Sequence, residues 1–167
     1  MPEPNFNIFN IREVCESELE KCAEIIRKSF ATVAADFNFT PEKNPNHRAF
    51  IKTERLVHDR KSGIMQFGLF AEDMLAGFMA LEKIDTDIYK LEMLSVLPEF
   101  RHNGYGGAFI DFAKCKVKEL GGKKITISII DEHEVLKKWY MLNGFVHTGS
   151  EKFPHIPFTV GYMEVEV

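Results

Sequence analysis

The sequence predicts one domain of the mixed α/β (α+β) class, spanning residues 1–167. Segments rich in β-branched and aromatic residues alternate along the chain with segments whose apolar residues recur at helical spacing. A glycine-rich turn also stands between a predicted strand and a predicted helix. With 167 residues, of which 45% are hydrophobic, the chain is long enough to bury the core of one domain.

The first predicted elements are an extended segment at residues 7–12 and a helix. Ser17 and Glu20 have the spacing of a capping box, so the helix is expected to begin there. Its apolar face is formed by Leu19, Cys22, Ala23, Ile26 and Phe30. Prolines and asparagines predict a loop over residues 32–45, a candidate for the substrate side. Residues 46–59 favour a second helix, with Phe50, Ile51 and Leu56 toward the core.

Strand signals dominate the middle of the chain. Residues 65–72 and 75–84 flank the acidic turn Glu72-Asp73, as in a hairpin. Residues 89–96 predict a central strand that ends before Pro98, which has no N–H to donate to a ladder. The same patterns predict a helix from about Gly106 to Gly121-Gly122, followed by a strand at residues 124–130. A further helix is expected to end near Gly144, and its apolar face consists of Val135, Leu136, Trp139 and Tyr140. Two final strands are predicted at residues 145–153 and 159–166.

The composition argues against several classes of protein. Lys and Arg number 21 against 25 Asp and Glu, so no global field attracts nucleic acid. The three cysteines form no C-x-x-C pair, which favours a reduced, cytoplasmic protein. No signal peptide or membrane-spanning apolar run is visible, and we expect no membrane partner. No metal is expected, because these histidines lack ligand spacing: His47, His58, His102, His147 and His155.

The glycine-rich turn is the strongest candidate for a binding site. It consists of Arg101, His102, Asn103, Gly104, Tyr105, Gly106 and Gly107, between the central strand and a helix. Backbone N–H groups at a helix N-terminus lack intrahelical partners and carry the positive end of the helix dipole, so they suit a pyrophosphate. The alternative is that the glycines only turn the chain. Neither the P-loop pattern nor the complete G-x-G-x-x-G pattern is present.

Two motifs resemble those of one enzyme family. Arg101-x-x-Gly104-x-Gly106 matches the R/Q-x-x-G-x-G/A motif of the GNAT family of N-acetyltransferases, which follows a central strand. The later Leu136-x-x-Trp139-Tyr140-x-x-x-Gly144-Phe145 is similar to a second signature of that family. The resemblance covers residues 89–167, and the N-terminal half agrees in element order only. The resemblance implies a single-domain GNAT-like fold, with a central mixed, mostly antiparallel sheet of about six or seven strands and about four flanking helices.

The resemblance also implies a cosubstrate, acetyl-CoA, which lies between two splayed parallel strands. These are expected at residues 89–96 and 124–130. Backbone groups of Leu94, Ser95 and Val96 are then expected to contact the pantetheine arm and the acetyl carbonyl, and a free N–H near Val96 stabilises the oxyanion. Arg101 to Gly107 hold the pyrophosphate. His133 stands where many members have an asparagine, which departs from the family pattern, and a histidine there can still donate the pantetheine-side hydrogen bond.

Two residues are candidates for proton transfer. The resemblance assigns Tyr140 as the acid that protonates the CoA sulfur, whereas the residue pattern alone favours an apolar ring on a helix face. Glu92 is the candidate base or ammonium anchor, because strand alternation places it on the side of Leu94. The alternatives for Glu92 are a solvent-facing glutamate and a water chain in place of the base.

The resulting hypothesis is an N-acetyltransferase that moves an acetyl group from acetyl-CoA to a primary amine of a small molecule or peptide, by direct attack in a ternary complex. The alternatives are a catalytically idle CoA-binding domain of the same fold and an unrelated nucleotide-binding protein. No residue pattern names the acceptor, and residues 30–59 are expected to select it. The final strand and exposed apolar groups are compatible with a homodimer.

Overall fold

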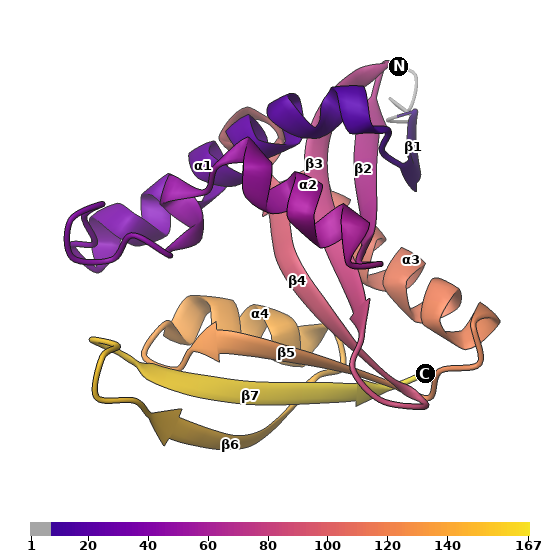
Figure 1. Cartoon of the computed structure of the whole chain (residues 1–167). Helices are drawn as coiled ribbons and strands as arrows, with labels where there is room; N and C mark the ends of the chain where they lie inside the picture. The colour runs from indigo at the N-terminus through magenta and orange to yellow at the C-terminus, as the bar shows by residue number, and fades with distance from the viewer. Residues whose placement is uncertain (1–7) are drawn as a thin grey trace, which may run out of the picture. The chain divides into compact units, whose positions relative to one another are not determined.

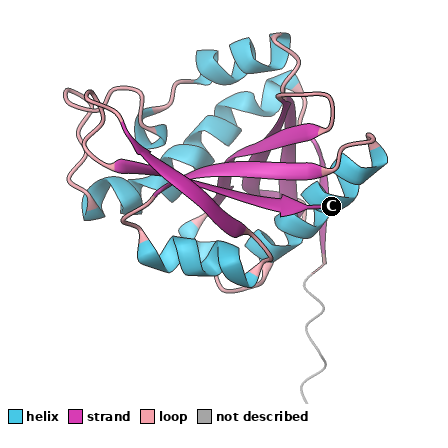
Figure 2. Cartoon of the chain, turned by 90° about the horizontal axis from the view of Figure 1, so that it is seen from below, coloured by secondary structure: helices cyan, strands magenta, loops and turns pink. Residues whose placement is uncertain are grey.

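The computed structural model describes residues 8–167, which form seven strands and four α-helices joined mostly by short loops (Figures 1 and 2). The elements are β1 (Phe9–Glu13), α1 (Leu19–Asp36), α2 (Thr53–Lys61), β2 (Met65–Ala71), β3 (Met74–Lys83), β4 (Ile88–Val96), α3 (Tyr105–Glu119), β5 (Lys124–Ile130), α4 (Glu134–Leu142), β6 (Val146–Lys152) and β7 (Thr159–Glu166). The strands are ordered β1-β2-β3-β4-β5-β7-β6 in one sheet. β4 and β5 are parallel, whereas β1–β2, β5–β7 and β6–β7 are antiparallel. The predicted α+β class with a mixed sheet is confirmed.

The chain divides into two compact units. The first contains residues up to Ala80 together with Met93–Phe109. The second contains Leu81–Glu92 together with Ile110–Val167. The single domain over residues 1–167 stays a prediction, and residues 1–7 lie outside the described part.

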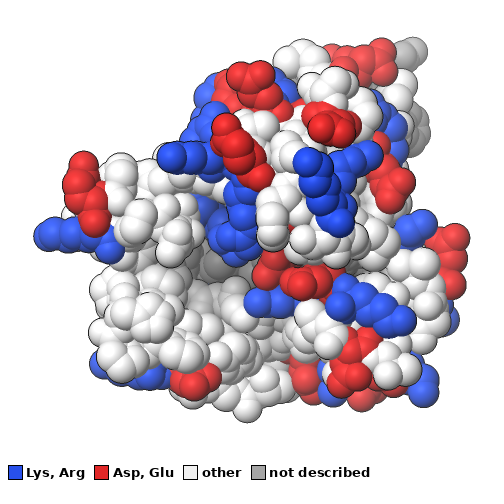
Figure 3. All heavy atoms as spheres, viewed as in Figure 1, with Lys and Arg blue, Asp and Glu red and all other residues white. Residues whose placement is uncertain are grey.

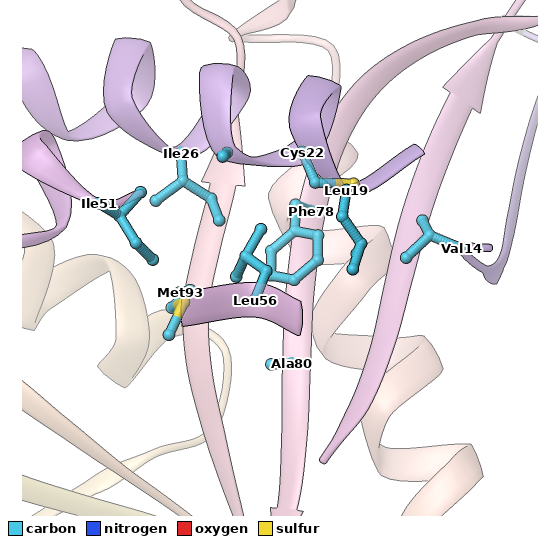
Figure 4. Close-up of a cluster of buried hydrophobic side chains, with 10 residues drawn as sticks. Val14, Leu19, Cys22, Ile26, Ile51, Leu56, Phe78, Ala80 and Met93 are labelled. Atoms are coloured by element: carbon cyan, nitrogen blue, oxygen red, sulfur yellow. The ribbon is translucent and has the colours of Figure 1, made fainter. Parts of the chain in front are cut away.

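The core of the first unit is built from α1, α2, β3 and β4. In Figure 4, Leu19 and Ile26 of α1 lie beside Phe78 of β3 and Leu56 of α2, and all four are fully buried. Burying one such side chain stabilises the fold by about 1.5–3 kcal/mol. The predicted apolar face of α1 is therefore confirmed, and Phe30 packs partly buried against the same cluster.

The start of α1 differs from the predicted capping box at Ser17. A short 3₁₀ turn, Glu16–Glu18, precedes the helix, and the Cys15 backbone N–H donates to the Glu18 carboxylate at 2.9 Å. Arg12 of β1 donates two further bonds of 2.9 Å to that carboxylate. These bonds, that from Arg12 first, lower the pKa of Glu18 to about 2. The box thus forms earlier in the chain, where Arg12 reinforces it.

The end of α1 lies later than predicted. The helix continues to Asp36, so the predicted loop over residues 32–45 starts with helix rather than coil. Asn38 adopts the left-handed conformation, with φ 57°, and the Phe39 N–H donates to the Ala34 carbonyl at 2.8 Å. This is the Schellman arrangement that closes a helix, and asparagine is a common substitute for glycine in it.

Several other predictions hold. Glu72 and Asp73 have φ values of 50° and 64°, as a two-residue hairpin turn requires, and they join β2 to β3. α3 ends before Gly121, which has φ 83°.

The second predicted helix is shorter than residues 46–59, because Arg48–Phe50 forms a separate 3₁₀ turn before α2.

The surface over α1 and α2 carries both signs of charge. Figure 3 shows acidic and basic side chains interspersed there, without a continuous basic region on this face. Several are paired, such as Glu24 of α1 with Lys28 at 2.7 Å. Among the helices of residues 8–167, none combines the length and apolar character needed to cross a bilayer.

Candidate functional site: the β4 strand and the glycine loop

β4 and β5 pair only over their first residues. The pairs are Ile88 with Lys124, Tyr89 with Ile125 and Lys90 with Thr126. Within residues 8–167 no later pair joins the two strands, although β4 continues to Val96 and β5 to Ile130. The splaying of strands 89–96 and 124–130 stays a prediction.

Met93 has a left-handed backbone in the middle of β4, with φ 56°. A non-glycine residue in this region costs about 1–3 kcal/mol, so the surrounding structure has to hold it there. The Met93 side chain is buried in the core cluster of the first unit (Figure 4), and the Ser95 hydroxyl donates to its carbonyl at 2.8 Å. Ser95 is itself buried, so its side chain supports the strand conformation.

The remaining side chains of β4 alternate in burial as predicted. Leu91, Met93 and Ser95 are buried, and the residues between them, Glu92, Leu94 and Val96, are half-buried. The Glu92 carboxylate forms an ion pair with Lys90 at 3.1 Å, and its side chain is only 12% exposed. This burial disagrees with the alternative of a solvent-facing Glu92.

The glycine loop is shaped by its own hydrogen bonds. It leaves β4 at Leu97, whose N–H donates to the Ala76 carbonyl of β3 at 2.9 Å. The Phe100 N–H then closes a short turn onto the Leu97 carbonyl at 2.9 Å. The Asn103 amide donates to the carbonyls of Phe100 and Arg101, at 3.0 and 3.2 Å. The loop is thus fixed by the chain itself rather than by a ligand.

Two left-handed residues turn the loop into α3. His102 has φ 63° and Gly104 has φ 78°, and a Cβ at Gly104 meets no atom within 4 Å. α3 begins at Tyr105, one residue earlier than predicted, and the Ala108 N–H donates to the Gly104 carbonyl at 3.0 Å. The N–H groups of Tyr105, Gly106 and Gly107 lie in the first turn of α3, where no intrahelical carbonyl is available to them. They form the positive end of a helix of 15 residues.

Arg101 is anchored to α1. Its guanidinium donates to the Ser29 carbonyl at 3.0 Å, which ties the loop to a helix 72 residues earlier in the chain. The Arg101 side chain is half-buried. A guanidinium has five N–H donors, so this bond leaves others for an anion.

Close packing holds the first turn of α3 in place. Tyr105 is buried, with its ring against that of Phe9 at a centroid distance of 5.4 Å. A Cβ at Gly77 of β3 would lie 2.7 Å from the Phe109 ring and 2.8 Å from the Ser95 carbonyl oxygen. Only glycine permits this approach of α3 to the sheet. The helix N-terminus is consequently a rigid feature of the first unit.

His133 caps α4 in the second unit. Its Nδ1 accepts a hydrogen bond from the Leu136 N–H at 3.3 Å. A neutral histidine that accepts through Nδ1 carries its proton on Nε2, so the other ring nitrogen is a donor. The prediction that histidine retains a donor in the place of the family's asparagine is compatible with this arrangement.

Tyr140 lies at the end of α4, and its neighbours explain the second signature. Gly144 has φ 94°, and the Phe145 N–H donates to the Tyr140 carbonyl at 3.1 Å, which closes the helix in a Schellman motif. The rings of Tyr140 and Phe145 meet edge to face at 5.3 Å, the apolar contact typical of that motif. Tyr140 is buried, and burial raises the pKa of its hydroxyl.

A family model identifies the family of the chain. Residues 20–145 match the model of the acetyltransferase (GNAT) family. The chain belongs to the GNAT acetyltransferase family. This membership assigns it to the acyl-CoA-dependent N-acetyltransferases and removes the alternative of an unrelated nucleotide-binding protein.

Solved structures show the same GNAT fold. The PaiA N-acetyltransferase of Thermoplasma acidophilum, in complex with coenzyme A, has a TM-score of 0.79 at 23% identity, over 96% of this chain and 99% of that chain. The ribosomal-protein-S18-alanine N-acetyltransferase of Escherichia coli has a TM-score of 0.76 at 13% identity, over 96% and 94%. A putative acetyltransferase of Salmonella typhimurium with acetyl-CoA has a TM-score of 0.71 at 12% identity, over 96% and 94%. The predicted cosubstrate agrees with these ligands.

The predicted site residues fall into both units. Leu94, Ser95, Val96 and residues 101–107 come together in the first unit, whereas Glu92, His133 and Tyr140 belong to the second. Within residues 8–167, no three His, Cys, Asp or Glu side chains gather as metal ligands. Sequence reasoning missed the left-handed Met93, which no glycine marks, and the Ser29 carbonyl that holds Arg101.

Proposed function

We propose that this GNAT protein transfers the acetyl group of acetyl-CoA to a primary amine of a small molecule or peptide, by direct attack in a ternary complex. The observation that carries the proposal is the preformed turn from Arg101 to Gly104, which leads into the first turn of α3, whose N–H groups have no intrahelical partner. These groups suit the pyrophosphate of acetyl-CoA. Arg101 adds a positive charge at the same place, using N–H donors that Ser29 does not take.

β4 supplies the next contacts. Because its pairing with β5 ends at Lys90, backbone groups of Leu94, Ser95 and Val96 are available to the pantetheine arm and the acetyl carbonyl. An N–H near Val96 then stabilises negative charge on the carbonyl oxygen during attack. The Nε2 proton of His133 serves as the pantetheine-side donor that asparagine provides elsewhere in the family.

Proton transfer completes the reaction. The amine nitrogen forms a bond to the acetyl carbon, the carbon–sulfur bond breaks, and the amine loses one proton while the thiolate gains one. The Tyr140 hydroxyl is protonated at neutral pH, as that of an ordinary tyrosine is, and burial raises its pKa further, so it can donate to the sulfur. Glu92, paired with Lys90, receives the amine's proton directly or through water, or anchors the ammonium group.

The acceptor does not follow from the fold. One neighbour acts on the alanine of a ribosomal protein, and another, at 16% identity and a TM-score of 0.71, is a chimera of a spermidine N-acetyltransferase. The same architecture therefore serves a peptide amine and a polyamine.

We place this protein in the cytoplasm, since its cysteines, Cys15, Cys22 and Cys115, are free thiols.

An acetyl-transfer assay tests the proposal. The protein is incubated with acetyl-CoA and a panel of polyamines, amino acids, aminoglycosides and short peptides with free N-termini. Free thiol is followed by a chromogenic disulfide, and products are followed by mass spectrometry. We expect thiol release that depends on one class of amine, with a mass gain of one acetyl group. Acetyl-CoA binding without transfer to any amine would instead indicate an idle CoA-binding domain.

A further inference from the structure

A charged cluster in the second unit joins the end of β5 to α4, and no step described so far uses it. Asp131 follows β5 directly, and its Oδ1 lies 3.0 Å from Nζ of Lys137 in α4. The same oxygen lies 2.9 Å from Nε2 of His147 in β6. Asp131 and Lys137 are partly buried, with side chains 22% and 18% exposed, whereas His147 is exposed. The Asp131 carboxylate thus contacts side chains of both α4 and β6.

The neighbouring strand is shaped to receive this carboxylate. A Cβ at Gly161 of β7 would lie 2.5 Å from Oδ1 of Asp131 and 3.2 Å from its Cγ. Any side chain at Gly161 therefore displaces the carboxylate, and only glycine leaves it room. The Asp131 N–H also donates to the Thr159 carbonyl at 2.9 Å, which fixes the backbone of the residue. The side chain of Asp131 consequently has one well-defined position.

The cluster acts on the part of α4 that carries the proposed acid. Lys137 and Tyr140 are three residues apart on α4, and residues at this spacing share one face of a helix. The far end of α4 is held separately, because Lys114 of α3 donates to the Asn143 carbonyl at 2.9 Å. The hydrogen bond from Lys137 lowers the pKa of Asp131, with that from His147 adding to it, so the carboxylate stays charged at neutral pH.

We propose that Asp131 is a positioning residue for acetyl transfer, whose carboxylate fixes α4 through Lys137 and thereby sets the place of the Tyr140 hydroxyl. The inference rests on the proposed function, in which Tyr140 donates a proton. Misplacing a proton donor by about 1 Å can cost roughly 100-fold in rate. Asp131 does not touch the reacting atoms in this account, so its effect on rate passes through Tyr140.

The test is a double-mutant cycle with Asp131→Asn and Tyr140→Phe. We expect Asp131→Asn to lower kcat roughly 10- to 100-fold in the wild-type background, with little change in KM for acetyl-CoA. In the Tyr140→Phe background, the same substitution is expected to cost less than about 3-fold, because the hydroxyl that it misplaces is already gone. Equal losses in both backgrounds would mean that Asp131 has only a structural role and would overturn the proposal.

A spectroscopic readout keeps the test independent of activity. Trp139, the single tryptophan of the chain, lies against Tyr140 with ring centroids 4.9 Å apart, so its emission reports the setting of α4. We expect Asp131→Asn and Gly161→Ala to shift this emission. The control Asp87→Asn removes another ion-paired aspartate of the second unit, 3.8 Å from Lys123, and is expected to leave emission and kcat unchanged.

The outcomes separate this inference from the proposed function. If the wild type transfers no acetyl group to any amine, the proposed function fails, and the emission of Asp131→Asn still decides whether the cluster sets α4. Unchanged Trp139 emission together with unchanged kcat in Asp131→Asn would overturn the positioning role. The positioning role is supported if Asp131→Asn shifts the Trp139 emission and lowers kcat only in the background that retains Tyr140.

Discussion

Replacing Tyr140 with phenylalanine is expected to slow acetyl transfer roughly 10²- to 10⁴-fold while leaving the affinity for acetyl-CoA nearly intact. The change removes only the hydroxyl. The ring keeps its edge-to-face contacts with Trp139 and Phe145, at 4.9 and 5.3 Å, so α4 and its cap remain folded. Steady-state kinetics with the best acceptor gives kcat, and calorimetry gives the dissociation constant of acetyl-CoA.

The matched control for this prediction is Tyr162→Phe. Tyr162 lies on β7 and its hydroxyl donates to the exposed Glu151 carboxylate at 2.9 Å, away from every residue of the proposed site. We expect this variant to retain the wild-type rate. A wild-type rate in Tyr140→Phe as well would remove Tyr140 from the mechanism and leave it as the apolar partner of Phe145.

Replacing Gly106 with tryptophan is expected to abolish acetyl-CoA binding. Gly106 is half-buried in the first turn of α3, where the backbone N–H groups have no intrahelical partner, and an indole there would cover the groups proposed to receive the pyrophosphate. Titration of acetyl-CoA by calorimetry measures the effect. The far-ultraviolet circular dichroism of the variant should match that of the wild type.

Gly149→Trp is the control for the added bulk. Gly149 lies in β6, and a Cβ there meets nothing within 4 Å, so the strand accommodates a side chain. We expect this variant to bind acetyl-CoA as the wild type does. Wild-type affinity in Gly106→Trp would show that the pyrophosphate lies elsewhere and would remove the glycine loop from the site.

The sequence was sufficient for features that depend on local periodicity. Strands at residues 65–72, 89–96 and 124–130 and the helix before Gly121 follow from alternation, helical spacing and a left-handed glycine, and the structure has them within a few residues. The glycine loop was also predictable, because its chemistry resides in consecutive backbone groups. The end of α1 was missed although Asn38, its left-handed cap, was a visible signal.

Features that depend on contacts between distant residues were not predictable. Met93 has φ 56°, its side chain is buried in the core, and its carbonyl accepts a hydrogen bond from the Ser95 hydroxyl. The sequence marks none of these features. The bond from Arg101 to Ser29 spans 72 residues. The Asp131 cluster likewise joins residues from three elements that no motif relates.

The thermal unfolding midpoint with and without acetyl-CoA tests the central claim most directly, because it requires no knowledge of the acceptor. Acetyl-CoA at about 100 times its dissociation constant adds roughly 2.7 kcal/mol to the free energy of unfolding. For a chain of this length, the account predicts a rise in Tm of roughly 5 to 10 °C. ATP and NAD at the same concentration serve as controls and should give a much smaller rise. No rise with millimolar acetyl-CoA would contradict the account, since the loop would then be a turn without a cofactor.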